Sequence, residues 1–230
     1  MSPVPPNQLR GGRHGLPREE VVASQRRRLM DAMVAAVAER GFAATTVADV
    51  ISRAGVSRST FYEQFSDKDD CFVAAHNDLI ERLIDFVSAA YVRGESLEDK
   101  VRLGLDAFLQ ALAARPEAAR FAFIDVMAAS PRAHDQHRDA VRRFVAIFDE
   151  VGELTDRSGE LPASLSRVVV GGVATLVYEE IAAGRQTSVR RLLPEALYLA
   201  LVPYLGHERA LEEMASASGR DGAGAAEDAA

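Results

Sequence analysis

Apolar residues recur every three or four positions along most of the chain, a spacing that predicts helices. A first helix is expected over residues 18–40, where Pro17 and two glutamates precede an apolar stripe made of Leu29, Met30, Met33, Val34 and Val37. No segment alternates apolar and polar residues for long enough to form a sheet. The predicted fold class is therefore all-α, with about nine helices.

The stretch from residue 45 to residue 68 predicts two short helices separated by a glycine turn. Thr46 is placed to cap the first of them, and Asp49 follows at the spacing of a capping box. Gly55 suits the left-handed conformation that ends a helix, and Ser57 is placed to cap the next one. Two helices joined in this way form a helix-turn-helix, whose second helix enters the major groove of DNA.

That second helix, over about residues 58–64, is predicted to have one apolar and one polar face. Phe61 and Phe65 lie four residues apart, so they are expected to be buried together. Arg58 and Lys68 stand in the first turns of successive helices, where a cation opposes the helix dipole. They are either ordinary surface charges or contacts to a polyanion, and the polar face between them favours nucleic acid. The predicted DNA-binding residues are Thr46, Ser57, Arg58, Ser59, Thr60, Tyr62 and Lys68.

Residues 41–72 read GFAATTVADVISRAGVSRSTFYEQFSDKDDCF. This segment resembles the DNA-binding domain of the tetracycline-repressor (TetR) family of bacterial transcription regulators, and the likeness extends over about residues 20–75. The matching positions follow one another at fixed spacing without a gap: Gly41-Phe42, Thr46-Val47, the run from Ile51 to Ser57, Thr60-Phe61-Tyr62, Phe65 and Lys68.

The resemblance implies a homodimer built as a four-helix bundle from the last two helices of each chain. It also implies that a palindromic double-stranded DNA operator is bound by the two recognition helices. A ligand that enters the body would shift the helix after the helix-turn-helix and change the separation of those recognition helices.

The rest of the chain predicts a helical body. A long helix over about residues 66–92, capped by Ser66, would link the DNA-binding module to this body. Further helices are expected at 97–115, 116–129, 131–154, 162–183 and 189–205, with a polar loop at 156–160. The expected divisions are a disordered basic arm (1–17), a helix-turn-helix domain (18–66), a ligand-binding and dimerisation domain (67–206), and an acidic, largely disordered tail (207–230) that is helix-compatible at 208–214.

Charge is distributed unevenly along the sequence. The formal net charge is −7, yet residues 1–65 carry nine arginines against six carboxylates, so DNA is attracted to one end of the molecule. Arg10, Arg13 and His14 precede the first helix and belong either to a disordered tail or to an arm that enters the minor groove. The three arginines at 26–28 are either a solvated helix face or, for one of them, a contact to the DNA backbone.

The segments at 162–183 and 189–205 are apolar over too wide an arc for helices that cover only one side of a core. Gly171 and Gly172 stand in the middle of the first of them, where close helix approach would offset their poor helix propensity. One face is expected to pack on the body and the other on a second subunit. The predicted dimer contacts are Val173, Val177, Leu197 and Leu201.

Few polar residues interrupt the apolar positions of the body, which favours a ligand cavity over an active site. The predicted ligand-binding residues are Phe86, Phe108, Phe123, Asp125, Met127 and Tyr178. A solidly packed core is the alternative, with Asp125 on the polar face of a short helix and Tyr178 as a core residue whose hydroxyl is bonded.

No metal, cofactor or catalytic site is expected. His134, Asp135 and His137 lack a third and fourth ligand at recognisable spacing, and they are interpreted as a solvated helix start. The sequence has no phosphate-binding glycine loop and no hydrolase or zinc-protease motif, so an enzyme is not predicted. The single cysteine, Cys71, fits a reducing cytoplasm, and we expect neither a signal peptide nor a membrane span.

These patterns together predict an all-α, cytoplasmic, homodimeric DNA-binding regulator that responds to a small apolar molecule. A repressor released from its operator by that ligand is the first interpretation. An activator or a ligand-independent DNA-binding protein is the alternative, and a helical enzyme is the least favoured one.

Overall fold

The computed structural model describes residues 17–153, 155 and 161–227, with side chains described up to residue 218 apart from Glu153. All regular elements in these ranges are helices, so the predicted all-α class is confirmed. The expected N-terminal arm, with Arg10, Arg13 and His14, and the expected polar loop at 156–160 lie outside the described residues.

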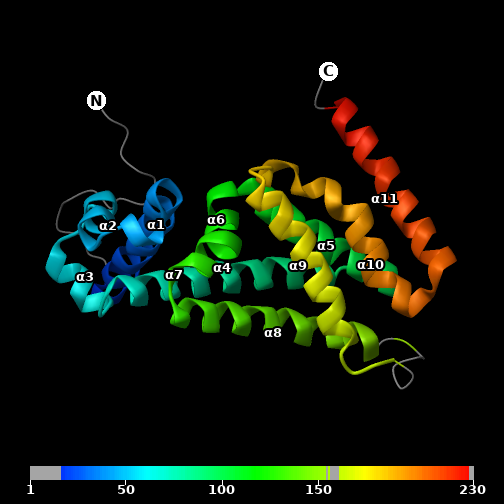
Figure 1. Cartoon of the computed structure of the whole chain (residues 1–230), viewed down its shortest axis with the longest axis horizontal. Helices are drawn as coiled ribbons and strands as arrows, with labels where there is room; N and C mark the ends of the chain where they lie inside the picture. Colours follow the sequence, from blue (N-terminus) through cyan, green and yellow to red (C-terminus); the bar gives the residue numbers. More distant parts are fainter. Residues whose placement is uncertain (1–16, 154, 156–160, 228–230) are drawn as a thin grey trace.

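The predicted DNA-binding module forms one end of the molecule from α1 (Arg18–Ala44), α2 (Val47–Ala54) and α3 (Arg58–Gln64) (Figure 1). Helix α1 runs past the predicted end at residue 40, through a kink at Gly41, whose φ of 75° is in the left-handed region. The kink lets Phe42 turn back onto the core, where its ring meets Phe72 edge-on at 5.0 Å between centroids.

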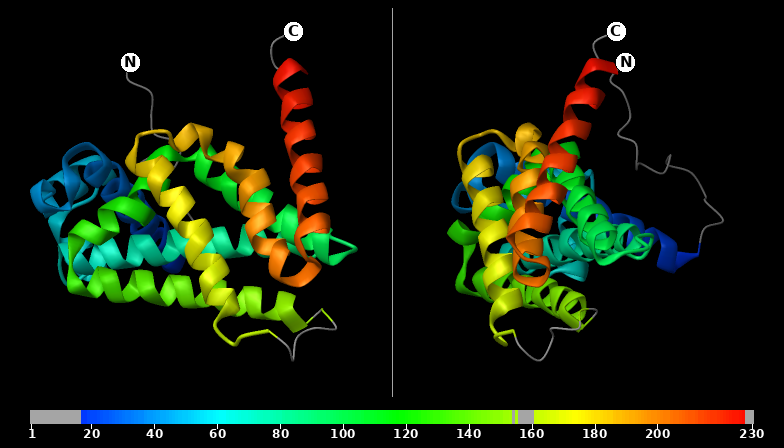
Figure 2. Two further views of the ribbon diagram at one scale, coloured as in Figure 1. Left: turned by 45° about the vertical axis from the view of Figure 1, so that its right-hand side comes forward. Right: turned by 90° about the vertical axis from the view of Figure 1, so that its right-hand side faces the viewer.

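Helices α4 (Lys68–Tyr91) and α8 (Pro131–Glu153) lie side by side and run from the DNA-binding module into the body (Figures 1 and 2). The predicted cap of α4, Ser66, is wrong by one residue. Asp67 is the N-cap and accepts a hydrogen bond of 2.8 Å from the backbone N–H of Asp70. Ser66 instead donates its own backbone N–H to the Asp70 carboxylate at 3.0 Å.

Helix α5 (Leu97–Ala114) ends before Pro116, as predicted, and Ser96 caps its start. The helix expected over 116–129 is continuous in direction but changes its winding in the middle. It consists of α6 (Pro116–Arg120), a π-helical segment η1 (Phe121–Asp125) and α7 (Val126–Ala129). A π segment shifts the residues that follow it around the helix, which affects which of them reach the interior.

Helix α9 (Leu165–Ala182) begins three residues after Pro162, later than the sequence suggests. The last predicted body helix is divided into a 3-10 segment η2 (Gln186–Leu192) and α10 (Leu193–Leu205). Pro194 explains the division, since it lies in the first turn of α10, where its missing N–H breaks no helical bond.

Residues His207–Glu227 form helix α11, which extends beyond the helix-compatible start expected at 208–214. The predicted helix-compatible start is confirmed, and the helix simply continues. Ala210 and Ala217 lie seven residues apart and are buried in the core formed with α10, and alanine is the strongest helix former. Gly206, with φ of 81°, reverses the chain between α10 and α11, and Figure 2 shows the end of α11 extending away from the body.

The hydrophobic interior forms two clusters, and the first crosses from the DNA-binding module into the body. Phe61 and Phe65 of the recognition helix are buried in it, as predicted. It also contains Phe72 of α4 and Phe121 of η1, whose rings lie 4.3 Å apart. The second cluster holds the body together around α5, α9 and α10. None of the described helices is long and apolar enough to cross a membrane.

Candidate nucleic-acid interface and ligand cavity

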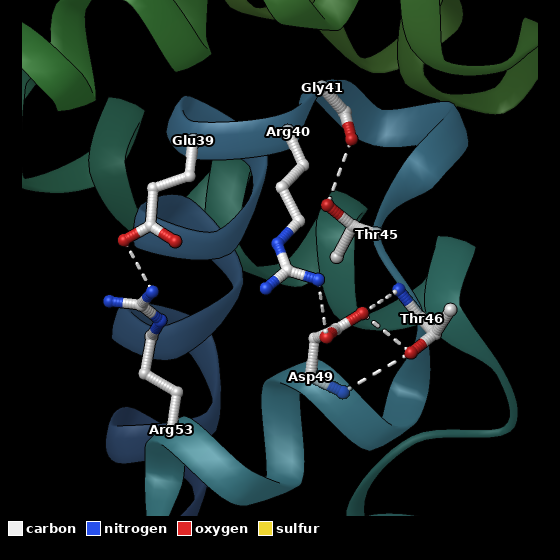
Figure 3. Close-up of polar contacts among 7 residues, drawn as sticks. All are labelled: Glu39, Arg40, Gly41, Thr45, Thr46, Asp49 and Arg53. Atoms are coloured by element: carbon white, nitrogen blue, oxygen red, sulfur yellow. Dashed lines mark hydrogen bonds and ion pairs between the residues drawn. The ribbon is translucent and has the colours of Figure 1, made fainter.

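A polar network fixes the start of α2 against the end of α1 (Figure 3). The Asp49 carboxylate accepts the backbone N–H of Thr46 at 2.9 Å, and the Thr46 hydroxyl accepts the N–H of Asp49 at 3.2 Å, which confirms the capping box. Arg40 adds an ion pair to Asp49 at 2.9 Å. The hydrogen bonds from Thr46, helped by Arg40 and Arg53, hold the pKa of Asp49 below its usual value. The Thr46 hydroxyl is thus already engaged in the cap.

Three of the predicted DNA-binding hydroxyls meet at the start of α3. Ser57 caps the helix by accepting the N–H of Thr60 at 3.0 Å, as predicted. Its hydroxyl oxygen also lies 2.7 Å from that of Ser59 and 2.8 Å from that of Thr60. These side chains therefore form one small polar cluster at the N-terminal end of the recognition helix.

Arg58 and Tyr62 form the outer face of α3. They are one helical turn apart, and the Arg58 guanidinium lies 5.5 Å from the centre of the Tyr62 ring. Both side chains are exposed, whereas Phe61 between them is completely buried. The only polar contact between them is long, 3.4 Å from Arg58 Nη2 to the Tyr62 hydroxyl. A cation and an amphipathic ring are thus presented together to solvent.

Lys68 has an internal contact that the sequence did not reveal. Its ammonium donates a hydrogen bond of 2.8 Å to the Phe42 carbonyl and lies 4.2 Å from the centre of the Phe42 ring. The side chain is half-buried and ties the start of α4 to the end of α1. An ammonium carries three protons, so this contact leaves it able to reach a phosphate as well.

The arginine cluster at 26–28 is divided between two roles. Arg26 donates to the backbone carbonyl of Gln64, the last residue of α3, at 2.9 Å. Arg28 donates to the carbonyls of Ala54 and Gly55 at the end of α2. Both arginines therefore close helix ends within the module, where unpaired carbonyls and the helix dipole favour a cation. Arg27 alone is exposed.

A cavity of about 350 Å³ opens into the body between α4, α5, α8 and α9. Four predicted ligand-binding residues line it: Phe108, Phe123, Met127 and Tyr178. The prediction for Phe86 is wrong, because its side chain is 47% exposed and the next residue of α4, Val87, faces the cavity instead. Consecutive side chains of an α-helix point about 100° apart around its axis, so Phe86 and Val87 point in different directions.

Asp125, the other predicted ligand contact, does not line the cavity either. It lies at the end of the π-helical segment, is 5% exposed, and approaches the Arg120 guanidinium at 3.6 Å. Burial raises the pKa of its carboxyl, and the charge of Arg120 opposes that shift. The altered winding of η1 therefore directs this carboxylate into the helix packing beside Arg120.

Sequence reasoning missed His137, which lines the cavity from α8. The signal was present, because His137 shares helical spacing with Ala140, Val141 and Phe144, all of which also line the cavity. The neighbouring His134 points elsewhere and contacts the Met127 carbonyl through Nε2 at 2.6 Å. No group of three or more potential metal ligands occurs among the described side chains. Burial raises the pKa of Cys71 to about 12, which keeps its thiol unreactive.

The four predicted dimer contacts face the interior of their own protomer. Val177, Leu197 and Leu201 are completely buried, and Val173 is nearly so and lines the cavity. The predicted dimer contacts are therefore wrong at these four positions. Helix α9 packs so closely on α10 that a Cβ on Gly172 would lie 2.7 Å from Leu199 Cδ2. The outer face of α9 presents a different stripe at helical spacing, made of Val168, Gly171, Thr175 and Tyr178.

Comparison with known proteins agrees with this geometry. The model of the family described as bacterial regulatory proteins, tetR family, matches residues 29–75, which span the helix-turn-helix. The HTH-type transcriptional activator FasR of Mycolicibacterium smegmatis is 26% identical over 168 residues, covering 72% of this chain and 74% of that protein.

Solved structures share the fold over most of the chain. The fatty acid degradation regulator FadR from Bacillus halodurans has a TM-score of 0.70 at 18% identity and covers 77% of this chain and 94% of its own. The FadR regulator from Bacillus subtilis, in complex with stearoyl-CoA, has a TM-score of 0.66 at 17% identity and covers 78% and 98%. The helix-turn-helix of this chain therefore matches the DNA-binding domain of the tetR family of bacterial regulatory proteins, and the chain is a DNA-binding transcriptional regulator.

Proposed function

We propose that the protein is a homodimeric repressor that binds a palindromic operator through α3 and leaves it when a small apolar ligand occupies the cavity. The observation that carries the proposal is that α4 and α8 both line the cavity and both begin beside the DNA-binding module: α4 follows α3 directly, and Ala133 of α8 belongs to the same buried cluster as Phe61 of α3. Ser130 donates to Asp69 at 2.5 Å, and Arg132 pairs with Asp70 at 3.0 Å. The start of α8 is therefore fastened to the start of α4, directly after the recognition helix.

On the DNA side, we assign base contacts to the exposed pair Arg58 and Tyr62, with the hydroxyl cluster of Ser57, Ser59 and Thr60 beside them. An exposed arginine on a recognition helix is suited to bidentate contact with guanine. Lys68 is assigned to the phosphate backbone, because its ammonium retains protons beyond the one donated to the Phe42 carbonyl. Thr46, predicted as a DNA contact, is assigned to holding the start of α2, because its N–H and its hydroxyl both donate to the Asp49 carboxylate. The helix-turn-helix domain of this proposal comprises residues 18–66.

For the dimer, we assign the outer stripe of α9, Val168, Gly171, Thr175 and Tyr178, in place of the four buried positions. Val168 is 63% exposed and Tyr178 is 44% exposed, although both are large and Val168 is apolar. Gly171 has no other atom within 4 Å of an added Cβ, so another helix has room to approach the backbone there. Residues 67–206 would then combine ligand binding with dimerisation.

The ligand in this proposal has an apolar chain. All described side chains that line the cavity lack a formal charge at neutral pH, and aromatic or branched aliphatic residues predominate among them. The structural neighbour from Bacillus subtilis was solved with stearoyl-CoA, a molecule with a long apolar chain. This likeness in fold supports an effector of the same general character.

An activator is the second candidate, because the relative from Mycolicibacterium smegmatis is named a transcriptional activator. The contacts would be the same in that case. The sign of the effect would depend on whether ligand favours the DNA-bound or the free conformation, and on where the operator lies relative to the promoter.

Selecting bound DNA from a random library tests the proposal at physiological salt. We expect enrichment of a two-fold symmetric sequence with half-sites about one helical turn apart. A selection that enriches no sequence above the starting pool would contradict sequence-specific binding, whichever ligand is present.

A further inference from the structure

Two histidine rings meet edge to face where α4 contacts α8, at one wall of the cavity. His76 belongs to α4 and is completely buried, while His137 belongs to α8 and lines the cavity. Their ring centres lie 6.0 Å apart at an interplanar angle of 68°. The two helices that connect the body with the DNA-binding module therefore touch through this pair.

The pair has unused hydrogen-bonding capacity. Neither ring nitrogen of His76 has a partner among the described residues, and Nδ1 of His137 is also buried without one. Buried polar atoms are nearly always paired in folded proteins. Burial lowers the pKa of both rings, to about 4 for His76, so each is neutral and has one N–H donor and one acceptor nitrogen.

The backbone behind the two rings is also unusual. Ala122 lies in the π-helical segment and lines the cavity, and its carbonyl is close enough to both rings to oppose the fall in their pKa values. It forms no hydrogen bond with either nitrogen of His76 or with Nδ1 of His137. Short π segments are frequently found at functional sites. The wall therefore combines two unpaired imidazoles with a carbonyl from an irregular turn.

The remainder of the cavity limits the chemistry of a partner for His137. No Asp, Glu, Lys or Arg side chain lines it within the described part of the chain. A charged group placed beside neutral His137 would be buried without a counter-charge, which is strongly unfavourable. Met127 lines the cavity and is half-exposed, so it marks an open side through which a ligand would enter.

We propose that His137, supported by His76, is the specificity-determining polar contact of the cavity and binds one uncharged hydrogen-bonding group, a hydroxyl or an ester-type carbonyl, on an otherwise apolar ligand. This inference rests on the proposed role of the cavity in ligand binding. It adds that the ligand is held by its polar group at the junction of α4 and α8. A pure hydrocarbon fills the cavity without that contact, and a carboxylate meets no cation there.

The test uses four eight-carbon probes with the full-length protein: n-octane, 1-octanol, methyl octanoate and octanoate. Each displaces the uncharged dye N-phenyl-1-naphthylamine, and the dissociation constants are compared between the parent and His137→Leu. His134→Gln is the matched control, because His134 lies one turn away on the same helix and outside the cavity lining. His137→Gln retains hydrogen-bonding capacity and serves as the conservative variant.

We expect His137→Leu to weaken 1-octanol and methyl octanoate about fivefold to tenfold and to change n-octane by less than about twofold. His137→Gln and His134→Gln should leave the alcohol within about threefold of the parent. Equal loss for all four probes, or no loss for any, would overturn the proposal. Octanoate binding more tightly than methyl octanoate to the parent would overturn it as well.

A second measurement keeps the proposal testable if His137→Leu does not fold. The imidazole ¹⁵N resonances of the parent protein should shift for His137 on addition of 1-octanol but not of n-octane. Identical spectra with both probes would contradict the contact. If no probe binds at all, both this inference and the proposed ligand cavity fail, whereas binding without dependence on His137 removes only the inference.

Discussion

Arg26 donates a hydrogen bond of 2.9 Å to the backbone carbonyl of Gln64, so a side chain of α1 closes the last turn of the recognition helix. The same guanidinium lies 4.4 Å from the centre of the Phe65 ring. The position of α3 is therefore set partly by a residue on its inner side, which is separate from the outward pair Arg58 and Tyr62. Residues that hold α3 and residues that read DNA can be distinguished by experiment.

Replacing Arg26 with Gln should lower the free energy of unfolding by about 1–2 kcal/mol, through loss of the carbonyl bond and the ring contact. Urea denaturation followed by circular dichroism measures this. Arg27→Gln is the control, since Arg27 is exposed, and it should change stability by less than about 0.5 kcal/mol. If Arg26→Gln leaves stability unchanged but lowers the salt dependence of DNA binding, Arg26 is a phosphate contact instead.

The predicted readout by α3 is tested by Arg58→Ala. We expect a loss of about 1–3 kcal/mol of discrimination at one or two base pairs of a selected operator, measured by fluorescence anisotropy at fixed salt. Lys68→Met should instead weaken binding to all sequences and reduce the salt dependence. Because Lys68 also holds Phe42, its effect on unfolding has to be measured in parallel. An Arg58→Ala protein with unchanged sequence preference would exclude Arg58 from base contact.

The helix-turn-helix could be predicted from the sequence because its signals are local. Thr46, Gly55 and Ser57 each act through groups within a few residues along the chain, and each adopts the predicted cap. The inward roles of Arg26 and Lys68 depend on carbonyls 38 and 26 residues away. Contacts over such separations require the folded arrangement, so the pattern of apolar residues could not reveal them.

The proposed dimer face on α9 is tested by Val168→Glu. A carboxylate at a position that packs against a second subunit would be desolvated without a partner, at a cost of several kcal/mol. The dimer should therefore dissociate at micromolar concentration in sedimentation velocity experiments. Val92→Glu is the control, because Val92 is equally exposed at the end of α4 and away from α9. Sedimentation of the parent protein as a monomer at the same concentration would contradict the proposed dimer.

The histidine pair predicts a specific loss of stability in acid. The pKa of His76 falls from its usual 6.5 to about 4, so between these values the unfolded chain binds a proton that the folded protein does not. Stability should therefore decrease as the pH falls from about 6.5 to about 4, by up to about 3 kcal/mol from His76 alone, and His137 acts in the same direction. His76→Gln should flatten this dependence in urea titrations across the window. His207→Gln should not, because His207 is an exposed residue at the start of α11 and away from the pair. An equal slope in the parent and His76→Gln would contradict the assignment.

The limits of the sequence prediction are clearest in the body. Phe86 and Val87 are both large and apolar, and only the rotation of α4 against α5 and α8 decides which of them faces the cavity. The several apolar sides of α9 and α10 predict a partner contact for Val173 and Leu197, but both side chains are buried within the protomer, where Gly172 lies close to Leu199. The π-helical turn at Phe121–Asp125 has no recognisable sequence signal, and Asp125 at its end does not line the cavity.

The central claim is that the cavity and the DNA-binding module are coupled, and equilibrium titration of one selected operator tests it most directly. The dissociation constant for DNA is measured with and without a saturating apolar ligand that has been identified by dye displacement. The dissociation constant for the same ligand is then measured with and without operator DNA. We predict that ligand weakens DNA binding about a hundredfold, or about 2.7 kcal/mol, and that DNA weakens the ligand by the same factor. Equal DNA affinity in the presence and absence of bound ligand would contradict the account.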